Sequence, residues 1–237
     1  MANVAHLIIA GMGRSGSTLL LTLMQSFKGA DVWLNERTPV RYKTAVPVKH
    51  PRFKLFDSMK SLTITKRPAD IHNVERMQNI FTNPVGFILL KRDPRDVIVS
   101  KLFDKYWVNC NRCKSFFINL KKFQDREHVL TMAYEDLVRT PNDCQQTIAS
   151  FFDIKCQRTF TRHWKKVMTK KGQDLPSRMH AGLRGIRPIS PKSIGSWKKK
   201  EHRERVKNQL ERCPGLPDLL IQWGYEKDKK WLDLLSS

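Results

Sequence analysis

The sequence predicts a single α/β domain with a central parallel sheet flanked by helices, and three observations carry this prediction. Short apolar runs alternate with helical patterns along the chain, which is the order found when crossover helices join parallel strands. The run 84–90 is almost continuously apolar, as expected for a central strand covered on both faces. A length of 237 residues fits one ordinary domain and is short for two, so residues 1–237 are expected to form one unit.

Each element follows from local signals. Apolar and β-branched segments predict strands at 5–10, 31–36, 61–65, 84–90 and 128–132. Helical patterns and start signals predict helices at 17–27, 70–81, 94–106, 112–123, 141–152, 196–210 and 216–223. Asp93-Pro94 and Thr140-Pro141 are the clearest helix starts, because a capping side chain precedes a proline that suits the first turn.

Two stretches, 37–60 and 159–194, combine prolines and cations without a sustained period, and the second also contains several glycines. They are predicted to be long loops, with one short helix around Trp164 in the second. Right-handed crossovers place the loops that follow parallel strands at one edge of the sheet. We therefore expect a ligand to bind in the crevice at that edge, with these loops shaping the substrate pocket.

The charge of the chain indicates work with anions. Lysine and arginine number 44 against 22 acidic residues, a formal net charge of +22. Nucleic acid, an acidic polymer or a multiply charged cofactor would each fit this excess. No apolar stretch is long enough to cross a bilayer, and Met1 lies too close to the first strand for a signal peptide. A soluble cytoplasmic protein is the expectation.

Cysteine usage predicts neither disulfides nor a metal site. Five cysteines is an odd number, and they are scattered along the chain. Cys110 and Cys113 form a lone C-x-x-C, whereas a zinc site would need a second pair. Free thiols are therefore expected.

A glycine-rich loop between the first strand and the first helix is the first candidate site. Gly11, Gly13 and Gly16 lie within six positions, which lets consecutive backbone N–H groups face one bound oxyanion. The loop differs from the G-x-x-x-x-G-K-[ST] loop of nucleotide triphosphatases, because Ser17 occupies the lysine position. The nearby cation is Arg14, whose planar guanidinium suits a multi-oxygen anion without a metal.

The second candidate site is Arg92-Asp93-Pro94-Arg95-Asp96 followed by Ser100. It places a guanidinium at a strand end and a hydroxyl eight residues later, two turns into the predicted helix, so that both can close on one phosphate. Arg95 and Asp93 are expected to serve the turn. The alternative roles are a surface ion pair for Arg92 and a buried helix hydroxyl for Ser100.

Together these segments resemble the two cofactor motifs of sulfotransferases, R-S-G-S-T and R-[DN]-P-[RK]-D-x-x-x-S, about eighty residues apart. The resemblance is closer to glycan and bacterial-type members than to the cytosolic phenol-type branch. It implies a P-loop-NTPase-like sulfotransferase fold and the cofactor 3′-phosphoadenosine-5′-phosphosulfate (PAPS), with no metal required. The implied cofactor-binding residues are Gly13, Arg14, Ser15, Gly16, Ser17 and Thr18 for the 5′-phosphosulfate, and Arg92 and Ser100 for the 3′-phosphate.

The resemblance extends to two later segments. Tyr134-Glu135-Asp136-Leu137 is similar to the family's Y-E-D-L, whose tyrosine lies against the adenine; a core tyrosine is the alternative. Gly195-Ser196-Trp197-Lys198 is similar to the family's G-x-W-[KR]. Before it, the chain departs from the R-K-G of the cytosolic branch, and only Lys192 remains there to contribute charge to the cofactor.

For catalysis the resemblance implies Glu36, at the end of the second strand, as the base, with Lys66 and Arg14 stabilising charge on the sulfuryl group. A salt bridge to a neighbouring arginine is the alternative role for Glu36. His50 and His72 are the alternative bases, since the cytosolic branch uses a histidine.

The sequence thus predicts a sulfotransferase that moves a sulfuryl group from PAPS to a hydroxyl or amine of a glycan or small molecule, releasing adenosine 3′,5′-bisphosphate. The cation excess suits an acidic acceptor. A small-molecule P-loop kinase is disfavoured by Ser17. A protein that binds nucleic acid through its charge is the alternative of another class, but it gives no purpose to the loop or to Arg92 and Ser100.

Overall fold

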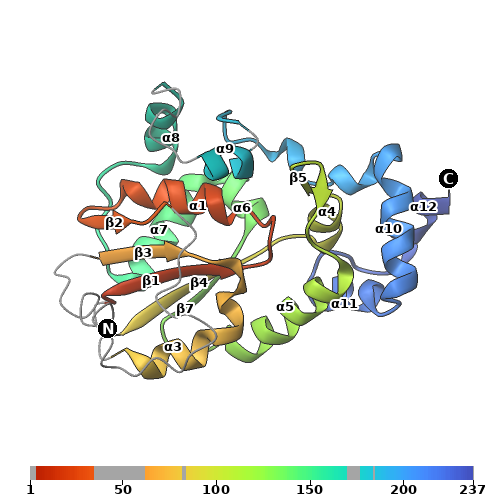
Figure 1. Cartoon of the computed structure of the whole chain (residues 1–237), viewed down its shortest axis with the longest axis horizontal. Coiled ribbons are helices and arrows are strands. Elements are labelled where there is room, and N and C mark those ends of the chain that lie inside the picture. Colours follow the sequence, from red (N-terminus) through yellow and green to blue (C-terminus); the bar gives the residue numbers. More distant parts are fainter. Residues whose placement is uncertain (1–3, 35–61, 82–83, 170–176, 184, 237) are drawn as a thin grey trace.

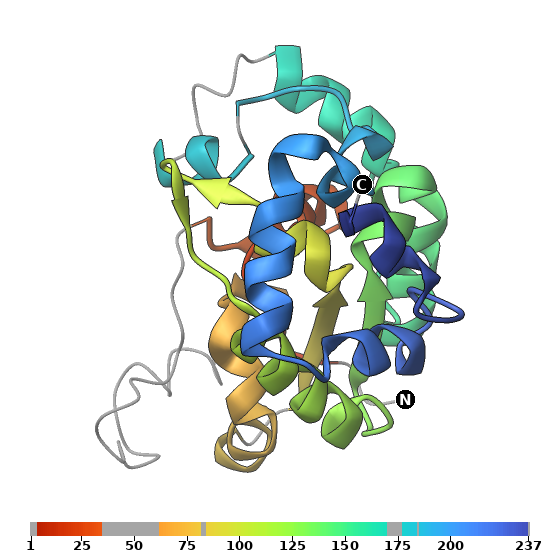
Figure 2. The ribbon, with the colours of Figure 1, turned by 90° about the vertical axis from the view of Figure 1, so that its right-hand side faces the viewer.

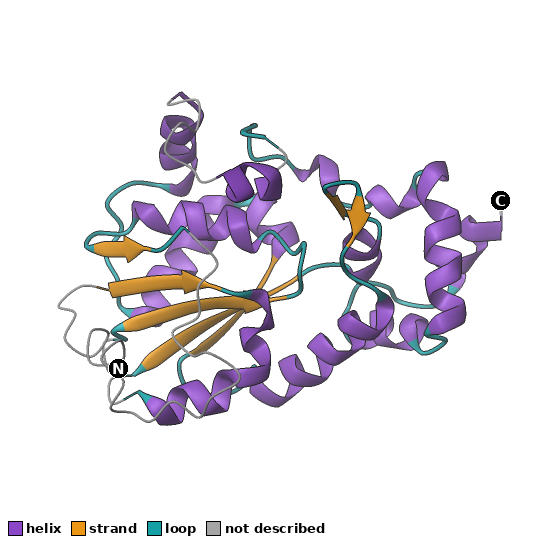
Figure 3. Ribbon diagram, in the orientation of Figure 1, coloured by secondary structure: helices purple, strands orange, loops and turns teal. Residues whose placement is uncertain are grey.

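A computed structural model describes residues 4–34, 62–81, 84–169, 177–183 and 185–236. Its main sheet has five parallel strands in the order β2-β3-β1-β4-β7 (Figures 1 and 3). The strands are β1 (His6–Gly11), β2 (Ala30–Val32), β3 (Leu62–Lys66), β4 (Val85–Lys91) and β7 (Val129–Ala133). The predicted parallel α/β architecture is confirmed.

Helices cover both faces of the sheet, because the side chains of its central strand alternate between two cores. Ile8 and Ala10 of β1 lie in one core, and Leu7 and Ile9 lie in the other. The first core is closed by α3 (Val74–Ile80), α4 (Pro94–Ile98), α5 (Cys110–Phe123), α10 (Lys200–Arg212) and α11 (Leu216–Gln222). The second is closed by α1 (Ser17–Leu23), α6 (Tyr134–Arg139), α7 (Pro141–Phe152) and α8 (Phe160–Thr169).

The remaining elements are short. They are the two strands β5 (Lys101–Leu102) and β6 (Lys105–Tyr106), helices α9 (Ser177–Leu183) and α12 (Asp233–Ser236), and the 3₁₀ turns η1 (Met24–Ser26), η2 (Pro68–Asn73), η3 (Pro191–Ser193), η4 (Ser196–Lys198) and η5 (Lys230–Leu232). Within the described ranges, no helix is long and apolar enough to span a membrane.

The helix predicted for 94–106 is wrong beyond its first turns. The α4 helix ends at Ile98, and the chain then forms the antiparallel hairpin β5-β6. The backbone N–H of Ser100 donates to the carbonyl of Val97, and Phe103 and Asp104 both have positive φ. These dihedrals close a two-residue turn and are incompatible with a continuing right-handed helix.

Within the predicted loop at 159–194, the short helix expected around Trp164 is confirmed as α8, whereas α9 was not predicted. Phe160 and Trp164 of α8 are buried against the core beside α1, with Val167 and Met168 partly buried next to them. This one-sided packing stabilises the helix that was predicted around Trp164. The predicted loop at 37–60 lies outside the described residues.

The pH dependence of stability should report on His6, which is buried on β1. Its Nε2 lies 2.9 Å from Thr65 Oγ1, and burial lowers the pKa of the imidazole to about 3. The unfolded chain binds a proton below about pH 6.5, whereas the folded chain does not. Unfolding free energy should therefore fall by up to about 1.4 kcal/mol per pH unit from this residue as pH decreases toward 3.

Urea unfolding of the wild type and of His6→Gln measures this contribution. The experiment runs from pH 7.5 to pH 4.5, a range of roughly three units that brackets the ordinary histidine pKa. The His6→Gln variant should show a flatter dependence on pH, while His72→Gln, at an exposed position, should retain the wild-type slope. Equal slopes for all three proteins would contradict the assignment.

Candidate active site

The loop between β1 and α1 turns tightly at the carboxyl edge of the sheet. A Cβ on Gly11, whose φ is 153°, would lie 2.4 Å from the carbonyl oxygen of Leu90 on β4. The Ser15 hydroxyl donates to the carbonyl of Met12 at 2.7 Å, and Arg14 adopts a left-handed φ of 68°. The loop is therefore held by its own hydrogen bonds and by close contact with β4.

Gly16 begins α1 and lies under an aromatic ring. Its φ is 88°, and a Cβ at this position would lie 2.3 Å from the ring of Tyr134. Any side chain would therefore be strained and would displace Tyr134. No side chain caps α1 at this end, so backbone N–H groups of its first turn are left to other acceptors.

Tyr134 is buried between the loop and the second motif. Its hydroxyl lies 2.7 Å from Ser193 Oγ, and the Arg92 guanidinium lies 4.3 Å from its ring centroid. The contacts on Gly16 and Arg92 make it a packing residue of this edge; neither of them tests the predicted adenine contact.

Arg92 follows β4 and joins three segments of the chain. Its two terminal nitrogens donate to the carbonyl of Arg14 at 3.0 Å and to the carbonyl of Ser193 at 2.9 Å. The carboxylate of Asp96 lies 3.9 Å away. The side chain is buried, and its Nε has no hydrogen-bond partner among the described residues. One donor of this guanidinium thus remains for a ligand.

Ser100 contacts Arg14 of the glycine loop, a pairing that the sequence did not predict. The Nε of Arg14 donates to Ser100 Oγ at 3.1 Å. The predicted position of Ser100 two turns into a helix is wrong, because it lies just beyond the end of α4. The short α4 helix and the turn that follows it still place the Ser100 hydroxyl against the glycine loop.

Lys66 ends β3, as predicted, and reaches the start of α1. Its Nζ donates to Thr18 Oγ1 at 3.1 Å, although the lysine is almost completely buried. The α9 helix lies over the same point, since a Cβ on Gly182 would lie 3.2 Å from Thr18 Oγ1. A positive charge is thus held beside the first turn of α1, where backbone N–H groups also favour an anion.

Sequence reasoning missed the role of Asp96, which organises the segment facing Arg92. Its carboxylate accepts hydrogen bonds from the backbone N–H groups of Gly195 at 2.8 Å and Trp197 at 3.1 Å, and from the Ser196 hydroxyl at 2.9 Å. Burial raises its pKa, and the nearby Arg92 guanidinium opposes that shift. The sequence offered only two separate hints of this contact, an acidic residue inside one motif and the Gly195-Ser196-Trp197 turn about a hundred residues later.

Asp93 and Arg95 serve the turn, as expected, and they also anchor the C-terminal region. Asp93 caps α4 and pairs with the guanidinium of Arg95 at 2.7 Å. That guanidinium lies between the rings of Trp197 and Trp231, at 3.9 and 4.5 Å from their centroids, and contacts Glu226. The chain end is thus packed directly behind the motif.

Several predicted site residues lie elsewhere or are not described. Lys192 is exposed on η3, and its side chain contacts no partner among the described residues, whereas the next residue, Ser193, makes the contacts. His72 is exposed on η2. Glu36 and His50 fall outside the described residues.

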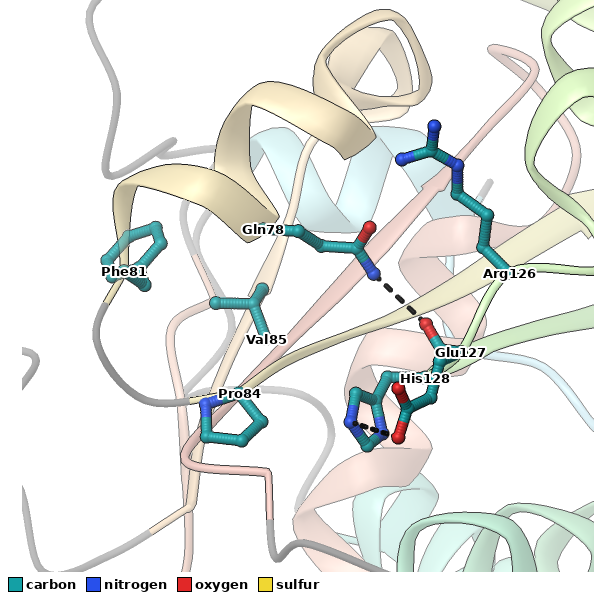
Figure 4. A pocket seen from close by; sticks show the side chains of 7 residues that line it. All are labelled: Gln78, Phe81, Pro84, Val85, Arg126, Glu127 and His128. Carbon is teal, nitrogen blue, oxygen red and sulfur yellow. Dashed lines mark hydrogen bonds and ion pairs between the residues drawn. The ribbon is translucent and has the colours of Figure 1, made fainter.

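A second hollow lies at the opposite edge of the sheet (Figure 4). Its lining includes Pro84 and Val85, where β4 begins, and His128, which precedes β7. Gln78 donates to the carbonyl of Glu127 at 3.0 Å across it. This hollow is at the amino ends of the strands and shares no residue with the cluster described above. Among the described residues, no cluster of histidines, cysteines and acids could hold a metal.

Comparison with known proteins agrees with this geometry. The model of the sulfotransferase domain family matches residues 5–212. The sulfotransferase domain from the curacin biosynthetic pathway has a TM-score of 0.56 at 16% identity, covering 88% of this chain and 97% of that one. The sulfotransferase domain from the Synechococcus PCC 7002 olefin synthase has a TM-score of 0.55 at 15% identity, covering 88% and 95%.

These two structures share the fold of this chain, and among curated protein sequences none matches it. The family match includes both strand-end motifs and every described residue of the cluster around Arg92. It spans most of the sequence, and the predicted fold and family are confirmed. The chain belongs to the sulfotransferase domain family.

Proposed function

We propose that this sulfotransferase uses PAPS as donor, transfers its sulfuryl group to a hydroxyl or amine of an acceptor and releases adenosine 3′,5′-bisphosphate. The observation that carries the proposal is the meeting of Arg14, Arg92 and Ser100 beside a glycine loop whose lysine position holds Ser17. Two guanidinium groups and a hydroxyl at one point suit a phosphate oxyanion bound without a metal.

The residues present fit the cofactor at both of its anionic ends. Arg92 has a buried Nε without a partner among the described residues. Ser100 lies near Arg92 because both contact Arg14, Ser100 through the Arg14 side chain and Arg92 through the Arg14 carbonyl. The uncapped start of α1, Thr18 and Lys66 form a second cationic point on the other side of the loop. In this proposal Arg92 and Ser100 bind the 3′-phosphate. The second group binds the 5′-phosphosulfate together with Arg14, whose bond to Ser100 is then exchanged for one to the sulfuryl group.

When bound, PAPS supplies an activated sulfuryl group. Lys66 and Arg14 then hold positive charge where negative charge develops on the transferring group and on the bridging oxygen. Glu36 accepts the proton of the acceptor as its oxygen or nitrogen attacks. Tyr134 contacts the adenine from its place between Gly16 and Arg92, and Lys192 adds charge from the rim. The net charge of +22 favours an acceptor that is itself acidic.

Ligand selectivity tests the donor directly. Adenosine 3′,5′-bisphosphate should raise the melting temperature of the protein, because a ligand that binds only the folded state stabilises it by mass action. ATP with magnesium should have little effect, since Ser17 stands in place of the lysine of nucleotide triphosphatases. A larger shift with ATP and magnesium would favour a kinase and contradict the proposal.

Arg92→Ala should weaken the binding of PAPS and of adenosine 3′,5′-bisphosphate together. Loss of a charge-assisted phosphate contact is expected to cost about 1.5–3 kcal/mol, or roughly tenfold to a hundredfold in affinity. Ser100→Ala should show a smaller loss. Calorimetry measures both, with the exposed Arg139→Ala as the control. Unchanged affinity in a folded Arg92→Ala protein would show that the 3′-phosphate binds elsewhere.

Glu36→Gln and Lys66→Ala should separate the two catalytic roles. Glu36→Gln removes a base while retaining its size, so turnover should fall by about two to four orders of magnitude with little change in donor affinity. Lys66→Ala should also reduce turnover, through lost charge stabilisation. Acceptors acidic enough to need no base should partly restore Glu36→Gln and leave Lys66→Ala impaired. Near-normal turnover of an alcohol by Glu36→Gln would move the search for the base to His50 and His72.

A further inference from the structure

The β5-β6 hairpin, residues 101–107, carries a group of exposed aromatic side chains. Five large hydrophobic side chains are exposed in the described ranges, and three of them lie on this hairpin. Phe103 is 62% exposed, Trp107 is 50% exposed and Tyr106 is 38% exposed. Scattered single apolar residues on a surface are ordinary, but a local group of aromatic side chains indicates a contact site.

The turn of the hairpin holds Phe103 at its tip in an unfavourable conformation. Leu102 pairs with Lys105, so Phe103 and Asp104 form a two-residue turn, with φ of 50° and 56°. Turns with positive φ at both positions favour Asn-Gly, and a bulky residue there is an outlier. The ring is largely in water and little packing within the domain compensates for this strain. Strain retained at an exposed tip points to a role in binding.

Hydrogen bonds inside the hairpin leave an apolar surface facing outward. The Trp107 Nε1 donates to the carbonyl of Leu102 at 2.9 Å, so the one polar group of this side chain is already used. Arg112 donates to the carbonyl of Trp107. Trp107 is therefore held in place, and its remaining exposed surface, like that of Phe103, can only make apolar contacts.

Two cations lie over the ring of Tyr106, the third exposed aromatic side chain of the hairpin. Lys101 Nζ lies 5.1 Å and the Arg205 guanidinium 4.3 Å from the ring centroid of Tyr106. Lys105 and Arg112 are exposed beside them, and Asp104 is the one acid within residues 101–107. Figure 2 shows the hairpin at one side of the domain. Its tip thus combines apolar rings with a flanking group of positive charges.

We propose that the 101–107 hairpin docks the protein on an anionic lipid surface. Phe103 and Trp107 enter the headgroup layer, where aromatic rings are favoured, while Lys101, Lys105 and Arg112 approach the negative charges of the lipids. A soluble polyanion would engage the cations but leave Phe103 and Trp107 in water. A second copy of the chain would bring two positively charged hairpins together, which electrostatic repulsion disfavours.

Docking through the hairpin would also bring the candidate active site close to the lipid surface. The hairpin follows Ser100, which bonds Arg14, and it precedes Val108, whose side chain lies 3.1 Å from where a Cβ on Gly13 would be. The lipid contact is independent of the proposed sulfuryl transfer, because it depends on exposed residues outside the cofactor cluster.

Co-sedimentation with vesicles tests the proposal. The full chain should bind phosphatidylcholine vesicles that contain phosphatidylserine, and binding should weaken with added salt and be lost without the anionic lipid. Phe103→Ser and Trp107→Ser should each weaken binding by about tenfold. Ile118→Ser, at a site 61% exposed on α5, should bind as the wild type does. The double variant Lys101→Gln, Lys105→Gln should weaken vesicle binding. The control double variant Lys155→Gln, Lys165→Gln should reduce vesicle affinity by no more than half as large a factor.

Phe103→Gly separates the contact from folding. Glycine relieves the strained φ, so its melting temperature should equal or exceed that of the wild type while vesicle binding falls by about tenfold. Vesicle binding that is unchanged in Phe103→Gly would overturn the proposal, as would wild-type protein that ignores anionic vesicles. The proposal would also be overturned if the protein bound soluble polyaspartate more tightly than vesicles and this binding required Phe103. Dimerisation that depends on protein concentration and is abolished by Phe103→Ser would overturn it as well.

Discussion

The guanidinium of Arg92 is the interaction on which the arrangement of the site depends. It donates to the carbonyl of Arg14 in the glycine loop and to the carbonyl of Ser193 near the C-terminal region, and it lies over Tyr134. Arg14 and Ser193 lie 78 and 101 residues from Arg92 in sequence, on opposite sides of it. One planar group with several donors joins these segments. The loop, the end of β4 and the 190–197 segment all depend on this contact. Displacement of Arg92 would therefore remove hydrogen bonds from both the loop and the 190–197 segment.

Buried charge explains why the C-terminal region belongs to the same unit as the sheet. A charge removed from water is costly unless hydrogen bonds or an opposite charge replace the water. Asp96 meets this condition through donors from residues 195–197, and Arg95 does so through Asp93 and two tryptophan rings. The residues that begin α4 therefore hold the 195–197 segment beside the carboxyl edge of the sheet. These contacts are structural, and they position Ser193 opposite Arg92.

The accuracy of the sequence-based predictions follows the range of the interactions involved. The strands at 6–11 and 85–91 and the cap at Asp93 depend on neighbouring residues, and all three were predicted correctly. The end of α4 was missed because Ser100 bonds Arg14, a partner 86 residues away. The short helix around Trp164 was predicted, whereas the helix at 177–183 was missed, because its Gly182 lies against Thr18 of α1, a partner distant in sequence.

The sequence alone therefore determined the parallel α/β class, the glycine loop, the strand-end positions of Lys66 and Arg92, and the family. Each of these depends on local composition, apolar period or motif spacing, which the chain order preserves. Only the tertiary structure decided that Asp96 holds the 195–197 turn, that Tyr134 packs on Gly16, and that residues 101–107 form an exposed hairpin. Those features arise from contacts between segments distant in sequence, and no local pattern records such contacts until the sheet brings the segments together.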